Sequence, residues 1–262
     1  MRRYLTLTLH LISLSWMQAM EYRGDFISWI MVDTGWSFMD FVFFTSLINR
    51  TQVIGDWNKG QSLIVLGIFR LMVIPVWGWM FNSFHTLPRL LSEGKLDMII
   101  TKPADSQFLV STRSFSFSII PSLFSGIIFI WMGFSLLHFF PNLFQIIIFL
   151  WLIIVSIILM YALYFLTMTA TLFTDRLDNI YHIFTALYDS SKYPAQIYPI
   201  IWQRLLTTIF PLALMIIVPA ESLFLPVNYL RLVQFHLLAL FFLIFGRWIW
   251  FRGLRRYSSA SS

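Results

Sequence analysis

Six long apolar stretches dominate this sequence, and each is at least as long as a membrane's hydrocarbon core is thick. A helix needs about 20 apolar residues to cross that core. The stretches cover residues 26–48, 61–84, 108–137, 143–173, 198–218 and 230–251. The strongest apolar run, residues 146–159, contains no charged residue. The sequence therefore predicts an all-α, polytopic membrane protein, with six transmembrane helices in a single domain over residues 1–262.

Composition supports this class. Only 11% of the residues are charged and the mean hydropathy is +0.76, whereas about a quarter of the residues in a soluble domain are charged. Cysteine is absent, which excludes disulfides, thiolate metal sites and catalytic thiols. We attribute the net charge of +6 to membrane orientation and expect no nucleic-acid partner. We also expect no removable signal peptide, because no typical cleavage site follows the first apolar run.

Residues 1–23 show a different pattern from the six long stretches. Arg2 and Arg3 precede apolar residues that recur at helical spacing, while polar residues occupy the other sides. The apolar positions are Leu5, Leu9, Ile12, Trp16 and Met20. This pattern is typical of a helix that lies in the membrane interface and contacts lipid, so we expect an interfacial elbow helix over residues 1–23.

The segment 86–105 separates the second and third stretches and is strongly polar. Its charged residues are Arg89, Glu93, Lys95, Asp97, Lys102 and Asp105. Pro88 suits the first turn of a short amphipathic helix, and Gly94 suits a left-handed turn that ends it. Leu96 and the apolar residues at 98–100 form a second apolar patch, which Pro103 closes. The segment suits docking of a water-soluble partner, and an ordinary solvated loop stays open as the alternative.

The distribution of Lys and Arg predicts the orientation. With six spans, both termini, the segment 86–105 and the loop 174–197 lie on one side, which carries thirteen Lys and Arg residues. The other side carries three, at Arg50, Lys59 and Arg231. Because cytoplasmic loops are enriched in these residues, we expect both termini to be cytoplasmic in a multi-pass protein of the inner or plasma membrane.

Four ionisable residues fall inside the apolar stretches: Asp33, Asp40, Arg70 and Arg204. Such groups are costly in a bilayer and usually face a partner or water. Asp33 and Asp40 lie seven residues apart and so share a helix face. Asp40 and Arg70 fall at similar depth and are expected to pair, with Asp33 as a second candidate partner; Asp33 and Arg204 also match in depth. Fixed helix register and a role in translocation both stay open.

No catalytic pattern is present. The sequence lacks the HExxH, GxSxG and P-loop motifs and a paired-carboxylate site, so we expect no catalytic residues and no ATP hydrolysis by this chain. The five histidines are scattered along the chain, so we expect no metal site.

Several short motifs resemble the membrane subunits of ABC-2-type exporters, in particular the daunorubicin-type and multidrug branch. They are Glu21-Tyr22-Arg23, Gly55-Asp56-Trp57, Glu93-Gly94-Lys95-Leu96-Asp97, Lys102-Pro103, Lys192-Tyr193-Pro194, Pro211, Val218-Pro219-Ala220 and Gly253-Leu254-Arg255-Arg256-Tyr257. They occur in family order over nearly the whole chain. The family tends to have an arginine before the proline at 103, where this chain has Lys102.

The resemblance implies six transmembrane helices, an elbow helix, and a coupling helix between spans two and three. It assigns ATPase coupling to Arg89, Glu93, Gly94, Lys95, Leu96, Asp97, Lys102 and Pro103. It also implies separate ABC ATPase subunits, which would hold ATP and magnesium, and a second permease subunit, identical or a sister chain. The chain itself would bind no cofactor. The alternatives are a secondary transporter and a membrane-embedded enzyme or scaffold without an ATPase partner.

Overall fold

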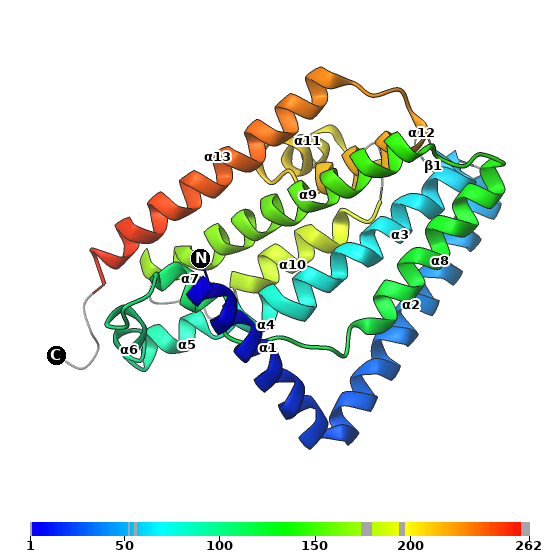
Figure 1. The fold of residues 1–262 in the computed structure, drawn as a ribbon. Helices are drawn as coiled ribbons and strands as arrows, with labels where there is room; N and C mark the ends of the chain where they lie inside the picture. Colours follow the sequence, from blue (N-terminus) through cyan, green and yellow to red (C-terminus); the bar gives the residue numbers. More distant parts are fainter. Residues whose placement is uncertain (1, 52, 55–56, 174–179, 194–196, 258–262) are drawn as a thin grey trace.

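A computed structural model describes residues 2–51, 53–54, 57–173, 180–193 and 197–257, and they form an almost entirely helical protein (Figure 1). The first half contains α1 (Arg2–Glu21), α2 (Arg23–Thr51), β1 (Val53–Ile54), β2 (Trp57–Asn58), α3 (Lys59–Pro75), the π-helix η1 (Val76–Met80), α4 (Phe81–Phe84), α5 (Leu87–Ser92), α6 (Asp97–Ile100) and α7 (Ser106–Ser111). The second half contains α8 (Ile120–Leu137), α9 (Leu143–Thr169), the 3-10 helix η2 (Ala170–Phe173), α10 (Ile180–Ser190), α11 (Ile200–Arg204), the π-helix η4 (Leu205–Ile209), α12 (Leu214–Phe224) and α13 (Tyr229–Leu254).

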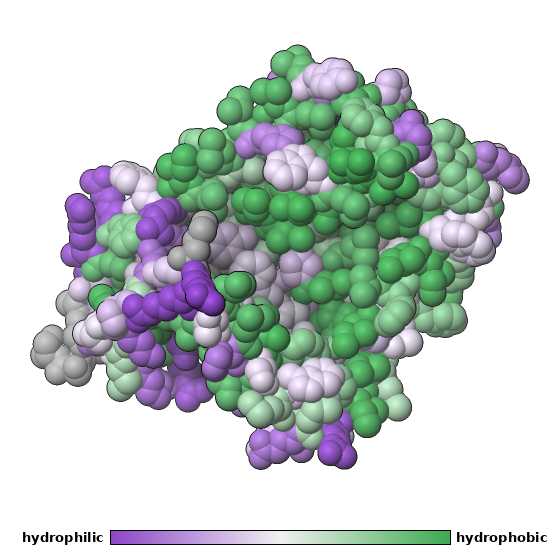
Figure 2. Space-filling model, viewed as in Figure 1, coloured by the Kyte–Doolittle hydropathy of each residue, from purple (hydrophilic) through white to green (hydrophobic). Residues whose placement is uncertain are grey.

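The long helices run between two ends of the molecule (Figure 1). One end gathers the start of α1, the end of α13 and the short helices α5 to α7. The other end holds the β1–β2 hairpin, where Trp57 contacts Phe224 with ring centroids 5.4 Å apart. Hydrophilic residues concentrate at the first end, and apolar residues cover the long helices (Figure 2). The helix α1 crosses the first end and meets α2 at a sharp corner (Figure 1).

Side-chain caps fix where the long helices begin. Asn58 and Gln61 form a reciprocal capping box at the start of α3, and Asn142 and Gln145 form the same arrangement at the start of α9. These amides satisfy backbone N–H groups that have no partner within the helix. Gly94, which follows the last turn of α5, adopts φ 65°. The predicted left-handed turn at the end of this helix is thereby confirmed.

Glycines allow α3 and α8 to pack with their backbones close together. A Cβ atom added to Gly67 would lie 2.7 Å from the carbonyl oxygen of Gly126, and one added to Gly60 would lie 2.8 Å from that of Gly133. The two glycines of each helix are seven residues apart, so they form one stripe along it. Small residues of this kind let membrane helices approach closely, and α8 is thereby held against the part of α3 that precedes Arg70.

The prediction of one span over residues 108–137 is wrong. Residues 112–119 are not helical, and Pro121 lies in the first turn of α8, which begins only at Ile120. Side chains from α4 and α1 replace the missing helical hydrogen bonds: Ser83 donates to the carbonyl of Ser114 at 3.2 Å, and Ser15 accepts from the N–H of Phe115 at 3.1 Å. Arg113 and the serines of this stretch therefore mark a connection rather than a span.

The region after α9 also differs from the prediction. Residues 174–197 were expected to form a cytoplasmic loop, but α10 packs inside the bundle. Phe184 stacks on Tyr164 at 4.2 Å, and Tyr188 stacks on Phe69 at 5.0 Å and donates a hydrogen bond to its carbonyl. Asp189 lies near the end of α10, and Lys192 follows the helix. Arg176 and Pro194 lie outside the described residues, as do Gly55 and Asp56.

The predicted span over residues 198–218 is broken. The run Ile200–Ile209 and α12 meet at 87°, with Pro211 in the break. Pro219, expected in a loop, lies inside α12, which continues to Phe224. Within the described residues, four helices are long and apolar enough to cross a membrane, or five if the bent pair is one span. The 29-residue helix α2 is not among them, because polar and charged residues interrupt its apolar sequence.

Candidate functional site

A stripe of polar side chains on α2 faces the interior of the bundle. Asp33, Ser37 and Asp40 lie on one helix face, as the spacing of the two aspartates predicted, and each is less than a tenth exposed. The opposite face of α2 exposes large apolar side chains, including Met31 and Phe38. The helix is therefore amphipathic, but its polar face is buried and its apolar face is exposed, whereas a helix of a soluble protein has the opposite arrangement.

Arg70 of α3 joins the two aspartates. Its Nη2 lies 2.7 Å from Oδ1 of Asp33, and its Nη1 lies 3.6 Å from Oδ2 of Asp40. The predicted Asp40–Arg70 pair is thus confirmed, and Asp33, the second candidate, is the closer partner. The Arg70 side chain is only 4% exposed. A guanidinium at such depth needs charged partners, because an unpaired buried charge is strongly destabilising.

Hydroxyl groups complete the coordination of this pair. Ser122 of α8 donates to Asp33 at 2.8 Å, and Arg70 donates to Ser37. Ser125 donates to Ser37 at 3.2 Å and extends the network along α8. The network therefore ties α2, α3 and α8 together at one level. Nε of Arg70 is buried and has no hydrogen-bond partner among the described residues.

Lys192, which follows α10, is the fourth charged member. Its Nζ lies 3.4 Å from Oδ1 of Asp40, so the four side chains carry two negative and two positive charges. Lys192 also lines a cavity of about 320 Å³ with Asp33, Asp40 and Arg70, and Trp29, Trp36 and Trp77 form much of its apolar wall. We call Asp33, Asp40, Arg70 and Lys192 the buried charge cluster. It lies beside an aromatic cavity within the helix bundle, and Asp189 of α10 adds a third carboxylate to the lining of that cavity.

The sequence analysis identified Asp33, Asp40 and Arg70 as charged residues within the membrane spans, but it misplaced Lys192 and Arg204. Arg204 was matched in depth with Asp33, but it lies exposed at the end of α11, and Asp33 is paired with Arg70 and Ser122. Lys192 was assigned to a cytoplasmic loop because the sequence of residues 174–197 is polar and mixed. Ser37 was overlooked, although its spacing of four residues from Asp33 placed it on the same face. No spacing rule along the chain links Ser122 to Asp33.

A second candidate site is the segment 86–105, which we call the coupling segment. Its apolar side anchors it: Leu87 and Leu96 are fully buried, and Leu90 and Ile99 are nearly so. The carbonyl of Leu90 accepts a hydrogen bond from the N–H of Leu96 at 3.1 Å, which closes the turn around Gly94. Leu96, which the family resemblance assigns to coupling, therefore holds the segment in place and has no surface to offer a partner.

The opposite side of the coupling segment is an exposed, mixed surface. Glu93 lies 2.6 Å from Nε of Arg89 and 2.6 Å from Nζ of Lys95. Hydrogen bonds from Arg89 and then from Lys95 lower the pKa of Glu93 to about 2, so the carboxylate is charged at every physiological pH. Met98 is 67% exposed beside this group, and Lys102 and Pro103 are exposed at its far end. Asp97 is half-buried at the start of α6.

The two sites are connected through one helical run. Residues Lys59–Ser92 include α3, which carries Arg70, and α5, which begins the coupling segment. The run passes through the π-helix η1, where Asn82 donates to the carbonyl of Trp77 at 2.7 Å. Short π segments often mark functional places in a helix, because one backbone hydrogen bond there is displaced. The run therefore connects the coupling segment to the level of the buried charge cluster.

This combination defines a class: a helical membrane protein with an anchored polar segment at one end and a charged, cavity-lining site in its bundle. The model of the ABC-2 family transporter proteins matches residues 34–261, and the chain belongs to that family. It is therefore a transport protein of the membrane, a permease subunit of an ABC transporter. No curated protein and no solved structure gave a significant match.

Proposed function

We propose that this chain is the permease subunit of an ATP-driven exporter and forms the translocation path together with a second permease subunit. The observation that carries the proposal is the anchored coupling segment, in a chain of the ABC-2 family. In this proposal the chain crosses the membrane six times. The first crossing is α2, whose Asp33 and Asp40 are neutralised by Arg70 and Lys192, and the broken run from α10 to α12 is the fifth.

The end that holds the start of α1 and the coupling segment is the cytoplasmic one in this proposal. Arg2, Arg3, Lys95, Lys102 and the basic end of α13 gather there, as expected for the cytoplasmic side of an inner or plasma membrane. The helix α1 is the interfacial elbow, since it crosses the ends of the long helices and exposes Leu5, Leu9 and Trp16.

Two ATPase subunits, encoded separately, would bind ATP and magnesium and dock on the coupling segment of each permease. Closure of the ATPase dimer would push α5 and α6, and the continuous run Lys59–Ser92 would carry that movement to Arg70. The buried charge cluster would then change partners as the permease opens outward. The chain itself hydrolyses nothing in this scheme: it acts as a gate.

Charge reversal tests the docking surface. Glu93→Arg combined with Asp97→Arg should abolish co-purification of the ATPase subunit in mild detergent and uncouple export, while the permease remains in the membrane. The matched control is Glu21→Arg with Asp25→Arg, two exposed acids at the corner of α1 and α2. Normal co-purification and export in the first double variant would overturn the docking proposal.

Cysteine labelling tests the orientation, since the chain contains no cysteine of its own. Arg2→Cys and His10→Cys should react with a membrane-impermeant maleimide only after the cells are opened. Asn142→Cys, in the turn before α9, should react from outside intact cells. Labelling of residue 2 or 10 in intact cells would show that the proposed sidedness is inverted.

A further inference from the structure

A cationic cavity at the proposed cytoplasmic end has no role in the function described above. It measures about 660 Å³ and lies between α1 and the stretch that leads into α7. Arg2, Arg3, His10 and Lys102 line it, and none of its lining residues is acidic. In the part of the chain that the structure describes, no carboxylate lies within ion-pair distance of Arg2, Arg3 or Lys102. The cavity is therefore an unneutralised cationic site.

The position of the two arginines strengthens the case for an anionic ligand. Both lie in the first turn of α1, a 20-residue helix with no acidic residue in that turn. Cations at a helix N-terminus oppose the helix dipole, which favours negative charge there. An anion bound between Arg2, Arg3 and Lys102 would reduce the repulsion among three like charges and would also interact favourably with the positive end of the helix.

A second, apolar cavity lies on the other side of Tyr4. It measures about 750 Å³, and residues of α1, η1, α7, α9 and α13 line it. Tyr4 lines both cavities; its ring contacts Phe108 at 4.7 Å and its hydroxyl accepts from the N–H of Asp105 at 3.2 Å. The two cavities are thus neighbours that share one wall.

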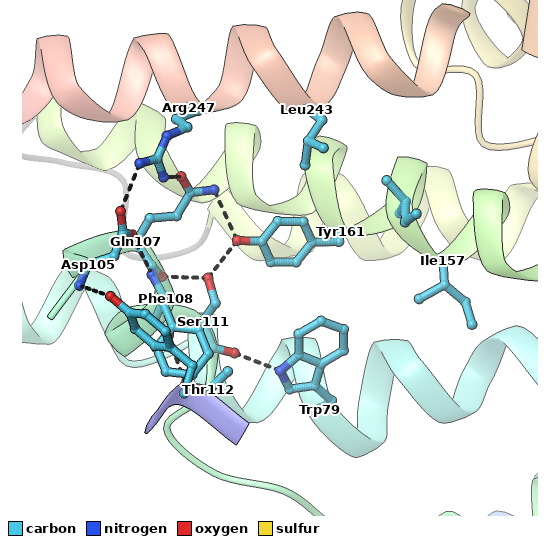
Figure 3. A pocket seen from close by; sticks show the side chains of 12 residues that line it. Trp79, Asp105, Gln107, Phe108, Ser111, Thr112, Ile157, Tyr161, Leu243 and Arg247 are labelled. Carbon is cyan, nitrogen blue, oxygen red and sulfur yellow. Dashed lines mark hydrogen bonds and ion pairs between the residues drawn. The ribbon is translucent and has the colours of Figure 1, made fainter. Parts of the chain in front are cut away.

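The second cavity is polar at one end and apolar at the other. Asp105, Gln107 and Arg247 form a hydrogen-bonded group at one end, and Ile157 and Leu243 line the other (Figure 3). Ile157 precedes Tyr161 by four residues and Leu243 precedes Arg247 by four, which places both about 6 Å farther from the polar end. Arg247 is paired with Asp105 at 2.8 Å, so it does not add a free charge to the cavity.

We propose that these two cavities hold one anionic phospholipid of the cytoplasmic leaflet, with its phosphate among Arg2, Arg3 and Lys102 and an acyl chain in the apolar cavity. The order of the parts matches a lipid in a bilayer, since the cations lie at the polar end of the molecule and the apolar walls extend toward its middle. Basic residues near the membrane surface attract anionic lipids in this way. A bound lipid would join α1, α13 and the end of the coupling segment.

Lipid retention tests the proposal on the full chain. The protein is purified in detergent micelles with equal amounts of phosphatidylglycerol and phosphatidylcholine, and the lipids that remain bound are measured by mass spectrometry. We expect several-fold enrichment of phosphatidylglycerol. Arg2→Gln, Arg3→Gln and Lys102→Gln together should remove most of this enrichment. The matched control is Arg23→Gln, Arg255→Gln and Arg256→Gln, which removes three cations from the same end but none from either cavity.

Further experiments distinguish binding of a lipid from binding of other anions. Leu243→Trp should fill the apolar cavity and lower retention of phosphatidylglycerol while the cations remain. Excess inorganic phosphate should not displace the lipid. Equal loss in the control variant, full displacement by phosphate, or cross-linking of Arg3→Cys to an ATPase subunit without lipid enrichment would each overturn the proposal. The assay needs no ATPase, so its result is independent of the proposed docking surface. Variants are compared only when their melting temperatures in detergent match that of the parent.

Discussion

Two arginine–carboxylate pairs in this molecule have nearly the same geometry and opposite surroundings. Arg70 and Asp33 lie 2.7 Å apart, and Arg89 and Glu93 lie 2.6 Å apart. The side chains of the first pair are 4% and 6% exposed, while those of the second are 77% and 33% exposed. The first pair joins two long helices, and the second lies within one short segment.

The comparison shows that environment, and not distance, decides what an ion pair does. Water and salt screen the exposed pair, and exposed pairs contribute about 0 to 1 kcal/mol. Removing one member of a buried pair strands the other charge and typically costs about 3 to 5 kcal/mol. Arg70 therefore holds α2 in register, whereas Arg89 and Glu93 are available to a partner at little cost in stability.

The largest effect is expected at Arg70. Arg70→Gln leaves Asp33 and Asp40 buried with only Lys192 as a cationic partner, so it should destabilise the protein by about 3 kcal/mol, measured as a lowered melting temperature in detergent. Asp33→Asn should cost more than Asp40→Asn, because Asp33 is the closer partner and also accepts from Ser122.

Double variants show which aspartate is coupled to Arg70. Asp33→Asn combined with Arg70→Gln should recover part of the loss, because no stranded charge remains, and Asp40→Asn with Arg70→Gln should recover less. Strictly additive losses in both double variants would show that neither aspartate is coupled to Arg70. In that case the Arg70 side chain would be independent of both aspartates and would interact with the cavity instead.

An intermediate effect is expected at Lys192. Its ion pair with Asp40 is 3.4 Å long, and the two side chains are 24% and 12% exposed, between the two extremes. Lys192→Met should cost about 1 kcal/mol, since Asp40 keeps Arg70 as a partner. The control is Lys59→Met, which removes a lysine bonded to the neutral amide of Asn49. A loss equal to that of Arg70→Gln would place Lys192 among the fully buried charges.

A smaller effect is expected at Asp105, which pairs with Arg247 and caps α7. Burial raises the pKa of Asp105, but hydrogen bonds from Arg247 and from the N–H of Phe108 outweigh it, so the pKa lies below its ordinary value of 3.8. Asp105→Asn retains the cap and should cost about 0.5 kcal/mol at pH 7. The stabilisation exists above the ordinary pKa and is lost below it, so the two melting temperatures should converge as the pH falls below about 4.

The sequence predicted the helical class, the short helix before Gly94 and the polar face of α2, because these depend on local composition and helical spacing. It failed where tertiary packing decides. Residues 112–119 lie within a longer apolar stretch, yet they are not helical, and side chains of α1 and α4 bond to their backbone. In the sequence Lys192 resembles a loop residue. It joins the buried charge cluster because α10 packs beside α3. Ser122 can donate a hydrogen bond to Asp33 because the glycines of α3 and α8 let these two helices pack closely.

The smallest effect on stability is expected at Glu93, although the coupling proposal gives it the largest effect on function. Hydrogen bonds from Arg89 and Lys95 lower the pKa of Glu93 to about 2. A lowered carboxyl pKa means that any stabilisation is present above the ordinary value of 4.5 and is lost only as the pH falls toward 2. The melting temperatures of the parent and of Glu93→Gln should therefore stay parallel between pH 5 and 8. They should also coincide within error, because the side chain is exposed and its pairs are screened. ATPase co-purification should weaken in the same variant. A large drop in melting temperature would show instead that Glu93 packs as part of the fold, and the contrast with Arg70 would fail.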